Sequence, residues 1–214
     1  MDSKNMGEDS IDLNEKKKKV NYKKEIFQWV VAIFTAIMIA LLIRAFIFEP
    51  VQVDGQSMED TLENGQKLIL YKLGYRFSEP KRGDIVVLKV KEGFWGDIPI
   101  IGNLPFFRES DKFPVEIDYI KRVIGIPGDE IDIRDGYVYV NGEKLEEPYV
   151  KGKTYKKNLE FPITVQKNHV FVLGDNRENS SDSRYQSLGC IDYSKIKGKA
   201  TFRFWPLDKF GYLY

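Results

Sequence analysis

The sequence is poorest in cysteine and histidine, with one residue of each, Cys190 and His169. A single cysteine cannot form an internal disulfide, and it excludes a thiolate-rich metal site. A histidine-based catalytic triad, or a site with several histidine ligands, would depend on His169 or not exist. Because His169 opens an apolar run without a carboxylate close by in sequence, we predict a structural role for it. Cys190 is predicted to be a small buried hydrophobic residue.

The chain also lacks an excess of either charge. Its 33 lysines and arginines nearly balance 32 acidic residues, leaving a net charge of +1. The overall charge therefore gives no argument for a nucleic-acid partner, and none is predicted. The charges are nevertheless placed unevenly, because a lysine cluster precedes an apolar run and acidic residues follow it. A chain of 214 residues allows one or two domains with a substantial core.

The apolar run covers residues 26–48. At about 1.5 Å rise per residue, a helix of this length covers the hydrocarbon core of a bilayer, about 30 Å thick. A buried core helix is the alternative, but the length and the flanking charges favour a membrane span. A cleaved signal peptide is disfavoured, because Phe46, Ile47 and Phe48 stand where small residues are needed. The lysines predict a cytoplasmic N-terminus. The predicted organisation is a cytoplasmic basic tail (1–24), a transmembrane anchor (25–48) and an extracytoplasmic domain (49–214).

Beyond the anchor, short β-like runs alternate with turn residues, which predicts a mainly β, antiparallel fold without a long amphipathic helix. Asp135-Gly136 and Asn141-Gly142 are strong hairpin turn signals. The predicted strands are Gln66–Lys72, Gly83–Val90, Asp118–Gly125, Glu130–Arg134, Tyr137–Val140, His169–Gly174 and Ala200–Trp205.

Segment 91–117 interrupts this pattern with an insertion rich in aromatic and branched apolar residues. Two interpretations stay open. The segment is a loop that folds back on the sheet, or a surface that contacts lipid or an apolar peptide.

Three places carry polar residues that a β core does not explain. Ser57 follows a turn at Gly55, a residue that tolerates backbone angles which others avoid. Lys121 and Arg122 lie inside an apolar strand, where alternation points one of them inward. Segment 174–184 is dense in hydrogen-bonding side chains and directly follows an apolar strand.

A nucleophilic serine needs a base, and a neutral lysine can serve. Lowering a lysine pKa from about 10.4 to about 7 costs roughly 4–5 kcal/mol, which desolvation can supply. A lysine in an apolar strand meets this requirement, so Lys121 is the candidate base for Ser57.

Four motifs in order resemble those of the prokaryotic type I signal peptidases, in their Gram-positive-like single-anchor form. QSMEDTL resembles the nucleophile box, RGDIVVLK a structural box, KRVIGIPGDE the box of the general base, and GDNRENSSDSR the last, supporting box. The resemblance extends from the anchor to Trp205. It implies a membrane-anchored serine endopeptidase that removes signal peptides from exported preproteins, with no metal or organic cofactor.

The resemblance also implies individual roles. Ser57 is expected to be the nucleophile and Lys121 the base, with Ser180 orienting Lys121 by a hydrogen bond. Asp182 and Arg184 are expected to form a supporting ion pair. For these last three residues, loop solvation and turn capping are the structural alternatives.

Two positions depart from the family pattern. Asp60 stands where the nucleophile box usually has proline, and we expect this to loosen the turn after Ser57. Gly55 stands where some members have a serine that helps to stabilise the oxyanion. The oxyanion would then depend on backbone N–H groups, chiefly that of Ser57, and each lost donor can be worth about 3–4 kcal/mol.

The expected partners are exported preproteins and the lipid bilayer, close to the secretion translocon, and the expected location is the cytoplasmic membrane. Two rivals remain. One is a membrane-tethered binding domain without activity, and the other is a Ser/Lys protein that cleaves itself. Between the anchor and the body, the sequence has no obvious cleavage site with small residues one and three positions before the cut (a small-x-small site). This argues against self-cleavage.

Overall fold

The computed structural model describes residues 22–91 and 117–213. The predicted insertion therefore lies outside the described residues, except for its two end residues, which belong to strands. Among the described residues, one helix, α1 (Tyr22–Phe46), is long and apolar enough by length and composition to cross a membrane. It ends two residues before the predicted end of the anchor, because Phe48 already begins a strand whose third residue is proline.

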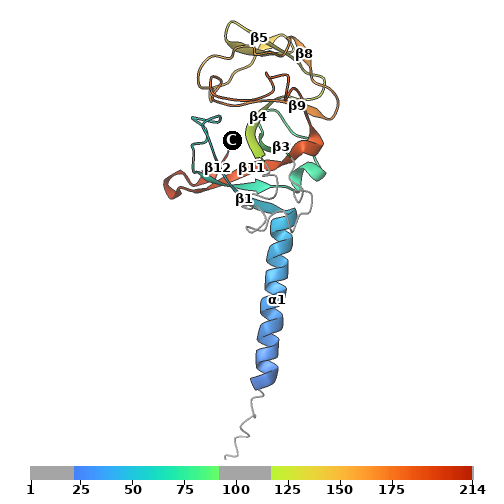
Figure 1. Cartoon of the computed structure of the whole chain (residues 1–214), viewed down its shortest axis with the longest axis vertical. Coiled ribbons are helices and arrows are strands. Elements are labelled where there is room, and N and C mark those ends of the chain that lie inside the picture. Colours follow the sequence, from blue (N-terminus) through green and yellow to red (C-terminus); the bar gives the residue numbers. More distant parts are fainter. Residues whose placement is uncertain (1–21, 92–116, 214) are drawn as a thin grey trace, which may run out of the picture. The chain divides into compact units, whose positions relative to one another are not determined.

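All strands belong to the compact unit Ala40–Tyr214. The larger sheet has the order β1-β2-β11-β3-β4-β9-β10, with β12 beside β11, and every pair is antiparallel (Figure 1). Its strands are β1 (Phe48–Gln52), β2 (Lys67–Tyr71), β3 (Ile85–Lys91), β4 (Ile117–Gly125), β9 (His169–Leu173), β10 (Ile191–Asp192), β11 (Ile196–Trp205) and β12 (Gly211–Tyr212).

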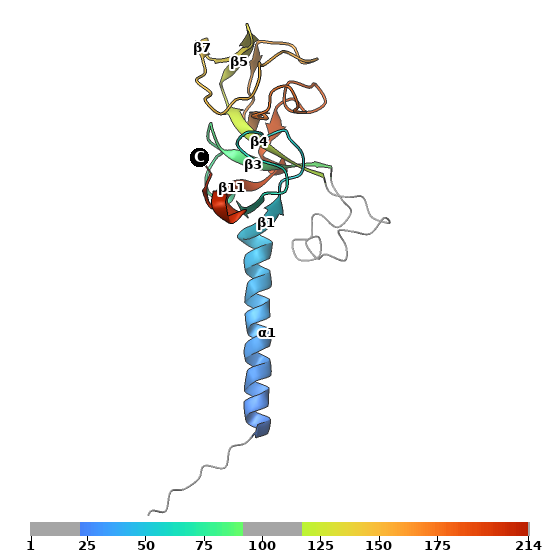
Figure 2. The same ribbon diagram turned by 90° about the vertical axis from the view of Figure 1, so that its left-hand side faces the viewer.

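A smaller antiparallel sheet has the order β7-β6-β5-β8 and lies at the opposite end of this unit from β1 (Figure 1, Figure 2). Both predicted hairpin turns join its strands. Asp135, Gly136, Asn141 and Gly142 all have positive φ, as a tight two-residue hairpin turn requires. Its strands are β5 (Glu130–Arg134), β6 (Tyr137–Val140), β7 (Glu143–Lys144) and β8 (Ile163–Thr164).

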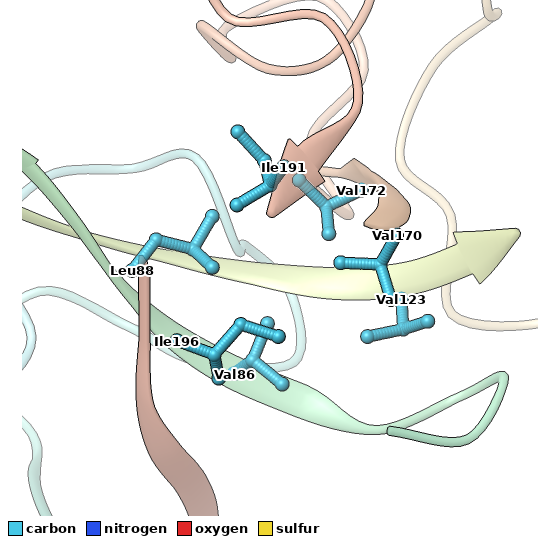
Figure 3. Packing of buried hydrophobic residues seen from close by; sticks show 7 residues of the cluster. All are labelled: Val86, Leu88, Val123, Val170, Val172, Ile191 and Ile196. Carbon is cyan, nitrogen blue, oxygen red and sulfur yellow. The ribbon is translucent and has the colours of Figure 1, made fainter. Parts of the chain in front are cut away.

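Three apolar clusters hold the sheets together. The first spans β11, β3, β4, β9 and β10 of the larger sheet and comprises Val86, Leu88, Val123, Val170, Val172, Ile191 and Ile196 (Figure 3). The second lies between the two sheets and comprises Ile124, Ile131, Val138, Val140, Val165, Phe171 and Leu173. The third underlies the segment after β1 and comprises Val53, Met58, Leu62, Leu68, Ile85 and Ala200.

Strand β4 lies inside the larger sheet and has covered side chains on both faces. Lys121 pairs in register with Val86 and Arg122 with Ile85, and these two partners belong to different clusters. Lys121 is 3% exposed and Arg122 is 2% exposed. The expectation that only one of the two points inward is therefore wrong, because both faces of the strand are covered.

The predicted fold class is confirmed, and each predicted strand has its counterpart within a few residues. Residues 50–53 alternate briefly like a strand, but the predicted strands do not include β1. They also omit the first four residues of β11 and the two-residue strands β7, β8, β10 and β12. After Phe46, helical structure in the described residues is limited to three short 3₁₀ turns, η1 (Gly74–Arg76), η2 (Tyr193–Lys195) and η3 (Leu207–Lys209).

The third cluster gives a stability prediction. Leu68 is fully buried, so Leu68→Ala should lower the free energy of unfolding by about 2–5 kcal/mol through lost burial and a new cavity. Leu207 is 71% exposed, and Leu207→Ala should change it by about 0.5 kcal/mol or less. Chemical unfolding of the detergent-solubilised chain measures both values. Equal effects would contradict this assignment of the core.

Candidate active site

Ser57 lies on a turn that directly follows β1. Gly55 has a φ of +95°, a conformation that side chains rarely adopt, and this reverses the chain before the serine. The Gly55 N–H donates to Oδ1 of Asn64 at 3.0 Å, so the turn is held by the segment that leads back into β2. Met58, next to the serine, is buried in the third cluster. The serine backbone is thus fixed from two sides.

Lys121 reaches Ser57 from β4. Its Nζ donates to the Ser57 Oγ at 2.8 Å and to the Ile120 carbonyl at 2.9 Å. The two side chains are 64 positions apart in sequence, and pairing of β4 with β3 fixes the lysine's position. When the amine is neutral, its lone pair can accept the hydroxyl proton across the same short distance.

The surroundings of Lys121 favour the neutral amine. Burial lowers the pKa of Lys121 from 10.5 to about 8, although the carboxylates of Asp182 and Asp175 act in the opposite direction. At pH 8 about half of the amine would be neutral, compared with well under 1% for an unperturbed lysine. The site therefore has a serine hydroxyl and a usable base in contact.

An open cavity of about 810 Å³ lies beside these two side chains. One wall is the end of β1 and the turn that carries Ser57, and the other is the first half of β4. The lining residues include Val51, Gln52, Val53, Gly55, Gln56, Ser57, Asn64, Val87, Asp118, Tyr119, Ile120, Lys121, Asn179 and Ser181. Backbone edges, small polar groups and a few apolar side chains suit an extended peptide.

Residues 174–184 fix the backbone of the turn that carries Ser57. The Asn176 N–H donates to the Ser57 carbonyl at 3.1 Å, and its side-chain amide donates to the Gln56 carbonyl at 3.1 Å. A Cβ at Gly174 would collide with the Ser57 carbonyl and with the Ser180 hydroxyl. Glycine is therefore required at position 174 for this close approach.

Comparison with known proteins identifies the family of the chain. Residues 26–205 match the family described as signal peptidase, peptidase S26. The chain belongs to this signal peptidase family. It is 38% identical over 200 residues to signal peptidase I of Bacillus licheniformis, covering 90% of this chain and 95% of that protein.

Two further matches come from other organisms. Signal peptidase IB of Staphylococcus aureus (strain MRSA252) is 33% identical over 207 residues, covering 89% of this chain and 95% of that protein. A crystal structure of a signal peptidase I from Enterococcus faecalis V583 covers 58% of this chain and 98% of its own, at 29% identity and a TM-score of 0.40. As a member of the signal peptidase family, the protein is a serine endopeptidase.

In this signal peptidase, three arginines are almost completely buried, and each is paired with a carboxylate. The predicted ion pair is present, with Arg184 Nε 2.8 Å from Asp182 Oδ1. Arg122 Nη2 lies 2.7 Å from Asp175 Oδ2. Sequence reasoning did not single out Asp175, although it stands in the polar segment after β9. Pairing removes the large cost of an isolated buried charge and fixes the backbone of residues 174–184.

The hydroxyl of Ser180 has no hydrogen-bond partner among the residues that the structure describes, although its side chain is buried. The hydrogen bond to Lys121 that the resemblance implies is therefore not formed here. His169 lies away from the cavity lining, and its Nδ1 is 2.9 Å from the Lys167 carbonyl. Cys190 packs against the second cluster, and burial raises the pKa of its thiol.

Asn64 is a site residue that sequence reasoning missed, because an asparagine before glycine reads as an ordinary turn. Asn64→Ala removes the acceptor for the Gly55 N–H and should lower kcat about fivefold, as expected for one hydrogen bond. Asn64→Asp keeps an acceptor and should retain most activity. Steady-state cleavage of a peptide substrate compares the two variants. Equal activity of Asn64→Ala and the unmodified protein would contradict this role.

Burial of the Lys121 amine should make the free energy of unfolding depend on pH. The folded-state pKa of about 8 lies below the unfolded value of 10.5, so the unfolded chain holds the proton more tightly between these values. Below pH 8 the full penalty, about 3 kcal/mol, opposes folding, and it disappears as the pH rises to 10.5. Lys121→Met should therefore raise Tm at pH 7 and raise it much less at pH 10.

Thermal melting of the detergent-solubilised protein at both pH values measures this difference. The same change of Tm at pH 7 and pH 10 would mean that the Lys121 pKa is not lowered in the folded state.

Proposed function

We propose that Ser57 and Lys121 form the catalytic dyad of a membrane-anchored signal peptidase that removes signal peptides from exported preproteins. The observation that carries this proposal is the 2.8 Å contact between Lys121 Nζ and Ser57 Oγ. Membership in the signal peptidase family and the matched signal peptidase I proteins support the substrate class.

In the proposed reaction, neutral Lys121 takes the Ser57 proton as the Oγ attacks the scissile carbonyl. The resulting ammonium donates this proton to the leaving amine, which breaks the peptide bond and leaves an acyl-enzyme. Lys121, neutral again, takes a proton from the water molecule that attacks the ester, and returns it to the Ser57 Oγ as the acyl–oxygen bond breaks. The tetrahedral oxyanion is proposed to accept a hydrogen bond from the Ser57 backbone N–H.

Ser180 is proposed to orient Lys121, with Asp182 and Arg184 as its support. The protonated amine has three N–H donors, and two of them are used by Ser57 and Ile120. The buried Ser180 hydroxyl has no other partner among the described residues and lies with the Ser57 carbonyl around Gly174. In this role the Ser180 hydroxyl would accept a hydrogen bond from the third N–H of the protonated amine.

The substrate is proposed to bind as an added strand. Among the described residues, β4 pairs with β9 only from Arg122 onward, and its residues 118–121 line the cavity. An extended leader peptide could add to the sheet along this part of β4. The sequence resemblance supplies the preference for small residues one and three positions before the cut.

The proposed location is the cytoplasmic membrane, with α1 as a single-pass anchor and the body on the extracytoplasmic side, near the secretion translocon. The length and composition of α1 and the lysines before it support this topology. Exposed aromatic side chains of Trp205, Phe210 and Tyr212 support contact of the body with lipid. The proposed regions remain 1–24, 25–48 and 49–214.

The decisive test is cleavage of a preprotein with a small-x-small site by the full chain in detergent. Ser57→Ala and Lys121→Ala should each lower kcat at least 1000-fold, since each removes a reacting group. The pH profile of kcat/KM should rise with a midpoint near 8, because the base must lose its proton. Full activity of Ser57→Ala would exclude this dyad.

The same experiment separates the self-cleaving alternative. A signal peptidase remains a single chain while its substrate is cut, whereas a self-cleaving protein accumulates as two fragments that Ser57→Ala abolishes.

A further inference from the structure

Residues 147–154 are part of the connection between β7 and β8, and this part of the connection approaches the active site. We call residues 147–154 the bridging segment. It belongs to the part of the chain that carries the smaller sheet, yet it also contacts the two loops on either side of Ser57.

The backbone of the bridging segment first holds the loop behind the serine. The Lys151 N–H donates to the Asp175 carbonyl at 2.8 Å, and the Arg177 N–H donates to the Lys151 carbonyl at 3.0 Å. Between these two bonds stands Asn176, whose N–H donates to the Ser57 carbonyl at 3.1 Å. The position of Lys151 is therefore linked to that of Ser57 through a single residue.

Side chains from both ends of the bridging segment hold the same loop through Arg177. This arginine is 1% exposed, and its guanidinium donates to the Glu147 carboxylate at 2.5 and 3.0 Å. It also donates to the Thr154 hydroxyl at 2.6 Å and to the Gly174 carbonyl at 3.0 Å. Gly174 is the residue that packs against the Ser57 carbonyl.

The Lys151 side chain extends to the loop on the other side of Ser57. Its Nζ lies 3.2 Å from Asp60 Oδ1 and 3.4 Å from Glu59 Oε2. An isolated exposed ion pair contributes little, partly because two flexible side chains must be ordered. Here the lysine backbone is already fixed by two hydrogen bonds, and two carboxylates share its charge. The ion pair therefore acts on a loop that begins two residues after the nucleophile.

We propose that the bridging segment is a positioning element for Ser57. Lys151 holds the position of the loop that follows Ser57, at Glu59 and Asp60. Glu147 acts through Arg177 to hold the position of residues 174–177, which contact the Ser57 carbonyl. The inference rests on the proposed role of Ser57 as nucleophile. None of the three residues touches the reacting atoms. Their effect should appear in kcat, because a misplaced Oγ lowers the rate of attack, while substrate binding along β4 is unchanged.

A charge swap between Lys151 and Asp60 tests the exposed half of this element. Lys151→Glu should lower kcat about fivefold in 20 mM salt and change KM less than twofold. The loss should shrink in 0.5 M salt, because exposed charges are screened. Combining Lys151→Glu with Asp60→Lys should restore kcat to within about twofold of the unmodified protein.

Lys153→Glu is the matched control, since it makes the same charge change two residues away on an exposed side chain. It should leave kcat unchanged. If Lys151→Glu behaves like Lys153→Glu, or if the swap fails to restore kcat, the positioning role of Lys151 is wrong.

Glu147→Gln tests the buried half. It should lower kcat as well, but independently of salt, because the Glu147–Arg177 pair is shielded from solvent. An unchanged kcat in Glu147→Gln would refute this half of the proposal.

The unmodified protein and Ser57→Ala are measured alongside these variants. If the unmodified protein is inert, or Ser57→Ala cuts, the proposed function itself fails. If both behave as expected and the bridging-segment variants have no effect, only the positioning role fails.

Discussion

Contact between a buried amine and a serine hydroxyl is the constraint on which the rest of this structure depends. An amine that loses its proton near pH 8 must be kept from water, so Lys121 stands on an interior strand whose two faces are covered. The hydroxyl must then be brought to the amine. A turn with a positive-φ glycine, fixed by Asn64 and anchored by Met58, provides that approach. The sheet thus supplies the buried amine, and the turn supplies the hydroxyl that it contacts.

The same region contains more buried charge than an apolar core allows unless the charges are paired. Three buried arginines meet three carboxylates, and their donors also satisfy backbone carbonyls of residues 174–180. This network rigidifies the loop that holds the Ser57 carbonyl. Two of these carboxylates also affect the pKa of Lys121. Asp182 and Asp175 stabilise the charged amine, whereas burial favours the neutral one. Burial has the largest effect of the three, so the pKa of Lys121 is lowered.

Much of the fold could be predicted because local patterns agree with the tertiary structure. The strands Glu130–Arg134 and Tyr137–Val140 have the predicted bounds, since their alternation and Asp-Gly and Asn-Gly turns are local signals. The two-residue strands were not predictable, because so short a strand exists only through its partner. Burial of both Lys121 and Arg122 was not predictable either. Alternation along a strand shows that two neighbouring side chains lie on opposite faces, but not whether both faces of the sheet are covered.

The sequence by itself determined the apolar segment of membrane length, the β-rich class, and the pairing of Ser57 with Lys121 as candidates, since length, alternation and chemical type are properties of the chain. The tertiary structure alone decided the 2.8 Å contact between them, the arginine partners, and the contacts of Asn64, Asn176 and Lys151. These depend on which segments, far apart in sequence, meet when the sheets pack. Local propensity carries no information about such distances, because only burial of the shared core fixes them.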